Sequence, residues 1–298
     1  MTVRRKFPEW LKKPLPKNSE AIRTADTLDS HRLSTVCRSA KCPNLTECFS
    51  HRVATFMIMG DVCTRNCAFC GVSKGIPHAL DADEPARAAE AAKKLGLKHV
   101  VVTSVTRDDI SDGGASHFSA TIRELRKSLP DSTVEVLVPD FHGDENALRV
   151  VLDAAPDIFN HNIETVPRLY PVVRPQADYR RSLGILKYAK KTMPQIRTKS
   201  GLMLGLGETD KEVVQVMQDL RIADCDMLTM GQYLQPGKGN FPVADFVLPT
   251  RFHEYELLAR SMGFHSAFCA PFVRSSYHAA DFVETERSNK NGKKTFAF

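Results

Sequence analysis

The sequence predicts an α/β fold in which strands and helices alternate along the chain and the strands pair in parallel around a barrel. Seven short apolar runs have the length of buried strands, and six stretches between them have the length and composition of helices. Alternating elements of this kind pair their strands in parallel and join them by right-handed crossovers. Six strand–helix units and a terminal strand favour a barrel, complete or open. An eight-unit barrel and an open sheet are the alternatives.

The first strand is expected at 54–59, and the first barrel helix begins at Asp83-Glu84-Pro85 and ends at Leu95. Acidic residues and a proline are typical of a first helical turn, and Gly96 stands where a helix stop is expected. Further strands are expected at 99–105, 133–138, 158–162, 199–206, 227–230 and 266–272. Further helices are expected at about 118–128, 145–154, 179–193, 211–223 and 250–262.

Residues 1–50 do not follow this alternation. Pro8, Pro14 and Pro16 argue against a long helix there, and 34–48 is interpreted as a cysteine-bearing loop with one helical turn. We expect an extension that is held down by its own metal cluster, because so polar a segment has little core of its own. The expected organisation is an extension at 1–50, a barrel at 51–270 and a C-terminal segment at 271–298.

Length and composition are those of a globular protein. The chain has 298 residues, of which 42% are hydrophobic and 26% charged, and no apolar run approaches the length of a membrane span. The basic N-terminus lacks the apolar stretch of a signal peptide, so we expect a cytoplasmic protein with no membrane partner. The formal net charge is +6, with basic clusters at 4–17, 180–191 and 293–294. Aromatic residues do not interleave with these clusters, which favours solvated faces over a nucleic-acid surface.

Three cysteines follow the first strand at the spacing C-x3-C-x2-C: Cys63, Cys67 and Cys70. A zinc site needs four ligands, usually as paired C-x2-C motifs. A cubane iron–sulfur cluster held by three thiolates instead leaves one iron free for a ligand that is not protein. A fragment of a zinc site and three buried thiols are the alternatives. With an aromatic residue, Phe69, directly before the third cysteine, the motif resembles that of the radical SAM enzymes.

A second triplet stands upstream, with Cys37, Cys42 and Cys48 at the spacing C-x4-C-x5-C. The two triplets in this order resemble the lipoyl synthase family. Five further segments resemble the same family: Ala54–Ile58, Asn160–Thr165, Gly201–Glu208, Gly231–Pro236 and Arg274–Ala279. The resemblance extends from about Pro8 to His278. It implies the partial (β/α)6, TIM-like barrel of radical SAM enzymes, which fits the elements counted above.

The resemblance also implies two 4Fe–4S clusters and S-adenosylmethionine. The downstream cysteines would hold the cluster whose free iron binds the amine and carboxylate of S-adenosylmethionine. The upstream cysteines would hold an auxiliary cluster. Its fourth ligand is expected to be Ser276 in the terminal Arg-Ser-Ser-Tyr motif, with Ser275 as the alternative.

Other residues are expected near S-adenosylmethionine on the same grounds. The turn Asp112-Gly113-Gly114 would receive the methionyl amine; an equal alternative is that the two glycines serve only to form a backbone turn. Asn162 and Glu164 would bind the ribose, and Phe69, Met203 and Gly205 complete the expected cofactor contacts. Arg174 and Lys199 are candidates for the substrate or the methionyl carboxylate, with solvation as the alternative. Buried structural roles are expected for His161, Cys225 and Cys269.

The activity implied is that of a sulfurtransferase that acts on an octanoyl chain amide-linked to a lysine of a lipoyl-carrier domain. No side-chain base can remove hydrogen from its carbons 6 and 8, whereas a primary carbon radical can, and the auxiliary cluster would donate the sulfur. The expected partners are octanoylated 2-oxoacid dehydrogenase E2 subunits, the glycine cleavage H protein, and an electron donor such as flavodoxin or ferredoxin. Two alternatives stay open. One is another two-cluster radical SAM sulfur-inserting enzyme, such as a methylthiotransferase or a biotin-synthase-like enzyme. The other is a non-enzymatic, metal-stabilised module that binds nucleic acid.

Overall fold

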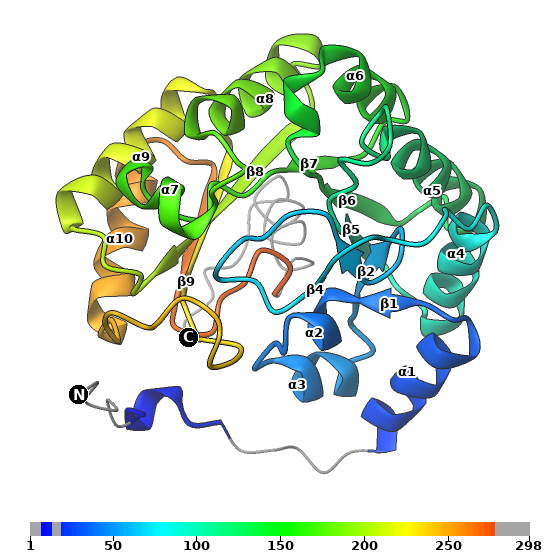
Figure 1. The fold of residues 1–298 in the computed structure, drawn as a ribbon, viewed down its shortest axis with the longest axis horizontal. Coiled ribbons are helices and arrows are strands. Elements are labelled where there is room, and N and C mark those ends of the chain that lie inside the picture. The colour runs from blue at the N-terminus through cyan, green and yellow to red at the C-terminus, as the bar shows by residue number, and fades with distance from the viewer. Residues whose placement is uncertain (1–6, 14–18, 278–298) are drawn as a thin grey trace, which may run out of the picture.

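Six strand–helix units and a final strand follow one another around a barrel (Figure 1). The computed structural model describes residues 7–13 and 19–277. The main strands are β1 (Ser34–Thr35), β2 (Thr55–Ile58), β5 (His99–Ser104), β6 (Thr133–Leu137), β7 (Ile158–Asn160), β8 (Arg197–Leu204), β9 (Met227–Gln232) and β10 (Ser266–Cys269). The outer helices are α4 (Glu84–Leu95), α5 (Ala115–Ser128), α6 (Glu145–Asp153), α8 (Tyr179–Thr192), α9 (Asp210–Ile222) and α10 (Pro249–Ser261).

The strands form one eight-stranded sheet in the order β1-β2-β5-β6-β7-β8-β9-β10. All neighbours from β2 to β10 pair in parallel, and only β1 runs antiparallel to β2. Among the residues that the structure describes, no pairing joins β1 to β10. The parallel α/β fold predicted from the sequence is confirmed, and the sheet has two edges in this part of the chain.

The predicted elements are confirmed, with shifted ends. The strand expected at 158–162 ends at Asn160, because the chain turns away and Glu164 takes a positive φ of 65°. The strand expected at 199–206 lies two residues earlier, at Arg197–Leu204, and the helix expected from 118 begins at Ala115. Gly96 ends α4 with a φ of 68°, as its position predicted.

The N-terminal extension contains more helix than the sequence predicted. It comprises η1 (Glu9–Leu11), α1 (Ser19–Ser30), α2 (Val36–Ser39) and α3 (Leu45–Ser50). The prolines limit helix only up to residue 16, and α1 begins after them. The Thr24 hydroxyl donates to the Phe49 carbonyl at 2.8 Å, which ties α1 to α3, and β1 joins the extension to the sheet.

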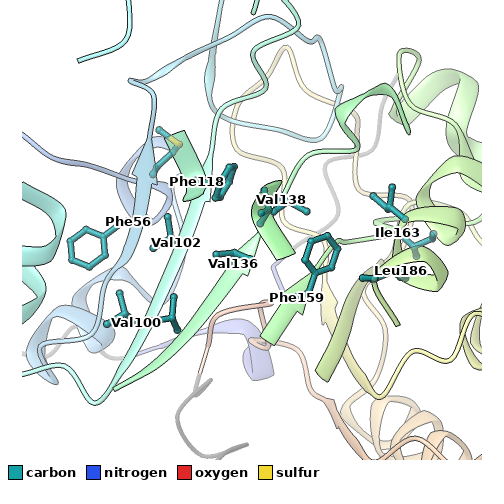
Figure 2. Packing of buried hydrophobic residues seen from close by; sticks show 14 of the residues in the cluster. Phe56, Val100, Val102, Phe118, Val136, Val138, Phe159, Ile163 and Leu186 are labelled. Atoms are coloured by element: carbon teal, nitrogen blue, oxygen red, sulfur yellow. The ribbon is translucent and has the colours of Figure 1, made fainter. Parts of the chain in front are cut away.

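The main core lies between the strands and the outer helices (Figure 2). Val100 and Val102 of β5 and Phe159 of β7 are completely buried, as are Phe118 of α5 and Leu186 of α8. Burying an apolar side chain of this size contributes about 1.5–3 kcal/mol, so this layer fixes the barrel on which the loops are built. No helix in the described ranges is long and apolar enough to span a membrane.

Inside the barrel, alternate residues of each strand form layers. Ile158, Met227 and Phe268 form an apolar layer at one end. The completely buried pair Glu135 and Lys199 lies next to it, with Glu135 opposite Ile158 and Lys199 opposite Met227 in the strand register. Smaller or polar residues of the barrel strands line a cavity that extends to the carboxyl ends, among them Thr55, Thr103, Gly201, Thr229 and Gly231.

Candidate functional site

A cavity of about 430 Å³ opens at the carboxyl ends of the strands. This volume lies within the range of cofactor and substrate sites. Its walls come from the barrel strands, the loop after β2, the N-terminal extension and the segment after β10. Five of the six predicted cluster cysteines line it: Cys37, Cys42, Cys63, Cys67 and Cys70. The two triplets therefore face one space, although they belong to different segments of the chain.

The downstream triplet lies on a loop that neighbouring strand ends hold in place. The Thr64 amide donates to the Thr106 carbonyl at 3.1 Å, and the Ala68 amide donates to the Val173 carbonyl at 2.9 Å. The Asn240 side chain, from the loop after β9, donates to the Cys70 carbonyl at 2.9 Å. Because three separate elements bind its backbone, this loop has little freedom to move.

An ion-pair network also fixes the downstream loop, and the sequence reasoning did not identify it. Arg65 is buried and donates to both oxygens of Asp108 at 2.7 and 3.0 Å. It also donates to Asp140 at 2.6 Å. Burial opposes ionisation of Asp140, but the Arg65 guanidinium outweighs it and lowers the pKa of this carboxyl to about 2. Arg65 thus joins the cysteine loop to the ends of two other strands.

The thiols of the downstream triplet suit an iron–sulfur cluster. The Sγ atom of Cys63 accepts from the Arg65 and Thr106 amides at 3.4 and 3.3 Å, and such donors stabilise a sulfur that carries negative charge. Burial raises the pKa of the Cys67 thiol, and raises that of Cys70 to about 11. These thiols are therefore neutral until a cationic group displaces their protons.

A zinc ion and a cubane cluster differ in the ligand arrangement that they need. No group of three His, Cys, Asp or Glu side chains in the described residues is arranged to hold a single metal ion. A tetrahedral zinc ion needs all its ligands about one centre. A cubane distributes its thiolates over different irons, so it does not need the thiols to converge on one point.

The upstream triplet lies on two short helices and the loop between them. Cys37 is in α2, Cys48 is in α3, and the Cys42 amide donates to the Cys37 carbonyl at 3.0 Å. The side chain of Thr35 caps α2 by accepting from the Arg38 amide. Burial raises the pKa of Cys48 to about 12, and the proximity of Cys37 and Cys42 adds to this increase. The three thiols therefore form one group, in which Cys48 lies behind the cavity wall.

The C-terminal segment reaches the cavity by crossing the end of β9. The Gln232 amide donates to the Pro271 carbonyl at 3.1 Å, and the Asn44 side chain donates to the Phe272 carbonyl at 2.7 Å. A Cβ atom at Gly231 would overlap the Val273 carbonyl oxygen, so only glycine allows this crossing. The Tyr277 hydroxyl donates to Glu47 at 2.7 Å, beside the upstream triplet. Residues 278–298, including His278 and the basic pair at 293–294, lie outside the described residues, as do 1–6 and 14–18.

The two serines of this segment have different surroundings. The Asn162 side chain donates to the Ser275 hydroxyl at 2.7 Å, so Ser275 belongs to the β7 side of the cavity. Ser276 also lines the cavity and makes no hydrogen bond to any described residue. Arg274, two residues before Ser276, interacts electrostatically with Cys42 and Glu164. This segment therefore lies between the two triplets.

Five of the other predicted site residues also line this cavity: Phe69, Asn162, Glu164, Arg174 and Met203. Asn162 donates to Glu164 at 3.1 Å. Arg174 donates through Nη1 to the carbonyls of Asn162 and Ile163 at 3.0 and 3.1 Å. Its buried Nε atom has no partner among the described residues, so it can donate to a ligand in the cavity.

The structure does not bring the Asp112-Gly113-Gly114 turn to this cavity. Asp112 accepts from the Gly114 and Ser116 amides at 2.9 and 2.8 Å, and so caps the start of α5. A Cβ at Gly113 would lie 2.9 Å from the Phe141 ring, and one at Gly114 would overlap the Met59 side chain. These glycines permit close packing and positive φ angles. They do not line the cavity, and their contact with the methionyl amine stays a prediction.

Two other predicted contacts are also absent from the cavity wall. Gly205 has a φ of 98° and packs against the Asp245 backbone and the Gln232 side chain. Lys199 is completely buried below the cavity and donates to both oxygens of Glu135 at 2.9 and 3.1 Å. The prediction that Lys199 contacts a ligand is therefore wrong, because its ammonium group is paired with the Glu135 carboxylate inside the barrel.

The three residues expected to be structural are buried. The His161 ring nitrogens bond the Val138 carbonyl at 2.8 Å and the Ser182 hydroxyl at 3.1 Å, and burial lowers the pKa of this histidine to about 4. Cys225 and Cys269 are buried, and burial raises the pKa of both thiols. The predicted burial is confirmed for all three, although His161 also lines the cavity beside Asn162 and Glu164.

The sequence reasoning missed the end of β5 as part of the site. Residues 103–106 line the cavity, and the buried Ser104 hydroxyl has no partner among the described residues. The signal was available, because polar residues at the carboxyl end of a barrel strand are candidates for ligand contacts. The prediction named only the glycine turn that follows this strand.

Comparisons with known proteins agree with this geometry. A profile described as the Radical SAM superfamily matches residues 57–220, more than half of the chain. The chain is 59% identical over 279 residues to the lipoyl synthase of Caldanaerobacter subterraneus subsp. tengcongensis, which covers 94% of this chain and 97% of the relative. It is 52% identical over 285 residues to the lipoyl synthase of Rubrobacter xylanophilus, which covers 96% of this chain and 89% of the relative.

Solved structures with the same fold are more distant in sequence. The crystal structure of methylornithine synthase (PylB) has a TM-score of 0.56 at 14% identity, over 94% of this chain and 95% of that one. Streptococcus suis SuiB bound to S-adenosylmethionine has a TM-score of 0.57 at 9% identity, over 76% of this chain and 53% of that one. At such identities the likeness concerns the fold alone.

Proposed function

Because this chain belongs to the lipoyl synthase family of the radical SAM superfamily, we propose that it converts a protein-bound octanoyl group into a lipoyl group. The reaction inserts one sulfur at carbon 6 and one at carbon 8 of the chain. The observation that carries this proposal is the single cavity that both cysteine triplets face. A radical source and a sulfur donor must both reach the same carbon atoms, and one shared cavity makes this possible.

Two 4Fe–4S clusters fit the donors present. Cys63, Cys67 and Cys70 would hold the cluster that binds S-adenosylmethionine, and Cys37, Cys42 and Cys48 would hold the auxiliary one. When bound, the first supplies the electron that cleaves S-adenosylmethionine to a 5′-deoxyadenosyl radical, and the second supplies sulfur. Buried or partly buried thiols in two groups of three, with amide donors at Cys63, are the appropriate donor chemistry for such clusters.

Ser276 is proposed as the fourth ligand of the auxiliary cluster. Ser275 is already bonded to Asn162, whereas the Ser276 hydroxyl has no partner among the described residues and faces the same cavity as Cys42. An alkoxide is a hard ligand and binds iron less well than thiolate does. A weak fourth ligand suits a cluster that must give up its sulfides.

S-adenosylmethionine is proposed to bind between β5, β7 and β8. The unpartnered Nε of Arg174 suits the methionyl carboxylate. The unpartnered hydroxyl of Ser104 is a further candidate for the methionyl end, beside the glycine turn Asp112-Gly113-Gly114. Asn162 and Glu164 suit the ribose hydroxyls. Phe69 and Met203 supply apolar surface beside them.

The side chains in the cavity suit radical chemistry better than proton transfer. Its lining contains only two carboxylates, Asp140 and Glu164. Asp140 is ion-paired with Arg65, and Glu164 is hydrogen-bonded to Asn162. No carboxylate can deprotonate an unactivated alkyl carbon at any pKa. The role of these residues is therefore to hold ligands and exclude water.

The expected partners are octanoylated lipoyl-carrier domains, namely 2-oxoacid dehydrogenase E2 subunits and the glycine cleavage H protein. An electron donor such as flavodoxin or ferredoxin would reduce the first cluster. We place the protein in the cytoplasm, with 1–50 as the extension for the auxiliary cluster, 51–270 as the barrel and 271–298 as the segment that closes the cluster. No nucleic acid or membrane is part of this proposal.

Anaerobic turnover tests the function. The reconstituted enzyme is mixed with dithionite, S-adenosylmethionine and an octanoyl-lysine peptide, and the products are measured by mass spectrometry. The expected result is a gain of two sulfurs in the peptide and two 5′-deoxyadenosines, one for each C–H bond broken. Cleavage of S-adenosylmethionine with a single methylthio group gained would instead indicate a methylthiotransferase. Clusters without any cleavage would contradict an enzymatic role.

A further inference from the structure

We propose that three exposed lysines at the mouth of the cavity, Lys41, Lys74 and Lys238, form a docking surface for an acidic face of the octanoylated carrier domain. We call these residues the lysine rim. The inference rests on the proposed function and adds to it the surface that recognises the protein carrying the substrate.

The charges of the cavity divide into an inner and an outer set. The inner cations are Arg65, Arg174 and Arg274, and each lies beside an inner carboxylate, Asp140 or Glu164. The outer ones that line the cavity are Lys41 and Lys74, which are exposed. Neither lysine makes an ion pair with any described residue, and the lining contains no other carboxylate that could neutralise them.

The lysine rim comes from three segments that meet at the mouth. Lys41 lies in the upstream cysteine loop and donates to the Pro236 carbonyl at 3.4 Å. Lys74 is in β4 (Ser73–Lys74), which pairs with β3 (Val62–Cys63) so that Lys74 stands opposite Cys63. Exposed Lys238 is two residues from Pro236, in the loop after β9.

A close approach of the same segments confirms that they share one rim. A Cβ at Gly71 would lie 3.0 Å from the Pro236 side chain and 3.3 Å from the Ser39 carbonyl. Gly71 follows the downstream triplet, Ser39 belongs to the upstream loop and Pro236 belongs to the loop of Lys238. The segments that carry the three lysines therefore lie next to one another at the edge of the cavity that Lys41 and Lys74 line.

The chemistry of the substrate selects the carrier domain as occupant. An octanoyl group amide-linked to a lysine can reach the cavity only if the folded domain that bears it rests on the mouth. The arm is one lysine side chain and one eight-carbon chain, so the domain surface next to that lysine must touch the rim. Unpaired cations there favour carboxylates on the partner and increase the rate of productive encounter.

An apolar residue beside the rim supports a protein partner. Ile76 is 94% exposed, the highest value among the large hydrophobic residues that the structure describes, and it follows Lys74 by two positions. An exposed aliphatic side chain two residues from an unpaired lysine suits a protein face with acidic residues near an apolar spot.

Charge reversal in the holoenzyme tests this surface. Lys41→Glu, Lys74→Glu and Lys238→Glu are compared using an octanoylated carrier domain and a short octanoyl-lysine peptide. Each variant should raise KM for the domain roughly tenfold relative to KM for the peptide, because it places like charges together. Salt should slow turnover of the carrier domain by the wild type more than turnover by a variant that combines the three substitutions. Lys94→Glu is the matched control, because Lys94 is exposed near the end of α4, at the opposite end of the barrel.

The outcomes separate this inference from the function itself. If the wild type converts the peptide and the variants keep the wild-type ratio of KM values, the lysine rim does not dock the carrier. If turnover with dithionite is normal but turnover with flavodoxin or ferredoxin falls, the surface binds the electron donor and the inference is overturned. If the wild type converts neither substrate, the proposed function fails instead.

Discussion

Replacing Lys199 by Met should destabilise the protein while leaving the chemistry of the cavity largely intact. The Lys199 ammonium lies below the cavity and binds Glu135, which also accepts from His99 at 3.2 Å and from Asn160 at 2.8 Å. Methionine has similar length and no charge, so the variant would leave a buried carboxylate without its main counterion. A residue that contacts a ligand would instead affect activity first.

The magnitude follows from two separate considerations. Removing one partner of a buried ion pair costs about 3–5 kcal/mol. Burial would raise the pKa of Glu135, but Lys199 and His99 outweigh it and lower the pKa from 4.5 to about 2. At about 1.4 kcal/mol per pH unit, this fall corresponds to about 3 kcal/mol. With an unfolding entropy of about 2.1 cal/mol/K per residue over 298 residues, a loss of about 3–5 kcal/mol lowers the melting temperature by roughly 5–8 °C.

The direction of the pH effect is fixed by the same pKa. Glu135 has a depressed pKa in the folded state, so its contribution to the free energy of unfolding is complete above pH 4.5. It is lost as the pH falls from 4.5 towards 2. In Lys199→Met the free energy of unfolding should fall less between pH 4.5 and pH 2 than in the wild type, because the ion pair no longer exists.

The assay is urea unfolding of the anaerobic holoenzyme, followed by circular dichroism. The single tryptophan, Trp10, lies in the N-terminal extension and does not report on the barrel. The control is the double variant Lys199→Met with Glu135→Gln, which removes both charges and should recover much of the lost stability. An unchanged urea midpoint in Lys199→Met, together with lost cleavage of S-adenosylmethionine, would refute the structural role.

Three further predictions concern the clusters. Cys67→Ala should abolish 5′-deoxyadenosine formation, whereas Cys42→Ala should retain it and transfer no sulfur; equal loss in both would contradict the division of labour. Ser276→Cys should strengthen the auxiliary cluster and slow sulfur release more than Ser275→Cys does, as followed by electron paramagnetic resonance and product mass; full sulfur insertion by Ser276→Ala, with an unchanged cluster spectrum, would reject Ser276 as a ligand. Gly231→Ala should displace the C-terminal segment at a cost of about 1–3 kcal/mol and lower the iron content of the auxiliary cluster, and normal iron content would show that the segment tolerates the added methyl group.

The alternation of strands and helices could be predicted because each element carries its own signal. An apolar run such as 99–105 and a helix start such as Asp83-Glu84-Pro85 can be recognised from residues that are adjacent in the sequence. The helix α1 was missed because the preceding prolines suggested that the whole extension lacked helix. Proline restricts helix only near its own position, and α1 begins beyond the last one.

The cluster ligands could be predicted because a cysteine motif identifies the ligand atoms directly. Cysteines at a fixed spacing indicate that their thiols bind one group, so their grouping could be expected before the fold was known. Asp112 and Lys199 carry no such information, because a carboxylate or an ammonium can serve a ligand, a helix start or an ion pair. Only the structure shows that Asp112 caps α5 and that Lys199 faces Glu135.

The two triplets come together because two positions in the segments around them are glycines, which have no side chain. Gly71 lets the downstream loop touch the upstream loop and Pro236, and Gly231 lets the C-terminal segment cross β9. A sequence pattern records these glycines as members of motifs, but their effect is a close approach between segments that are distant in the chain. Since Ser276 reaches the mouth only by way of the crossing at Gly231, the proposed fourth ligand depends on that glycine as much as on the serine itself.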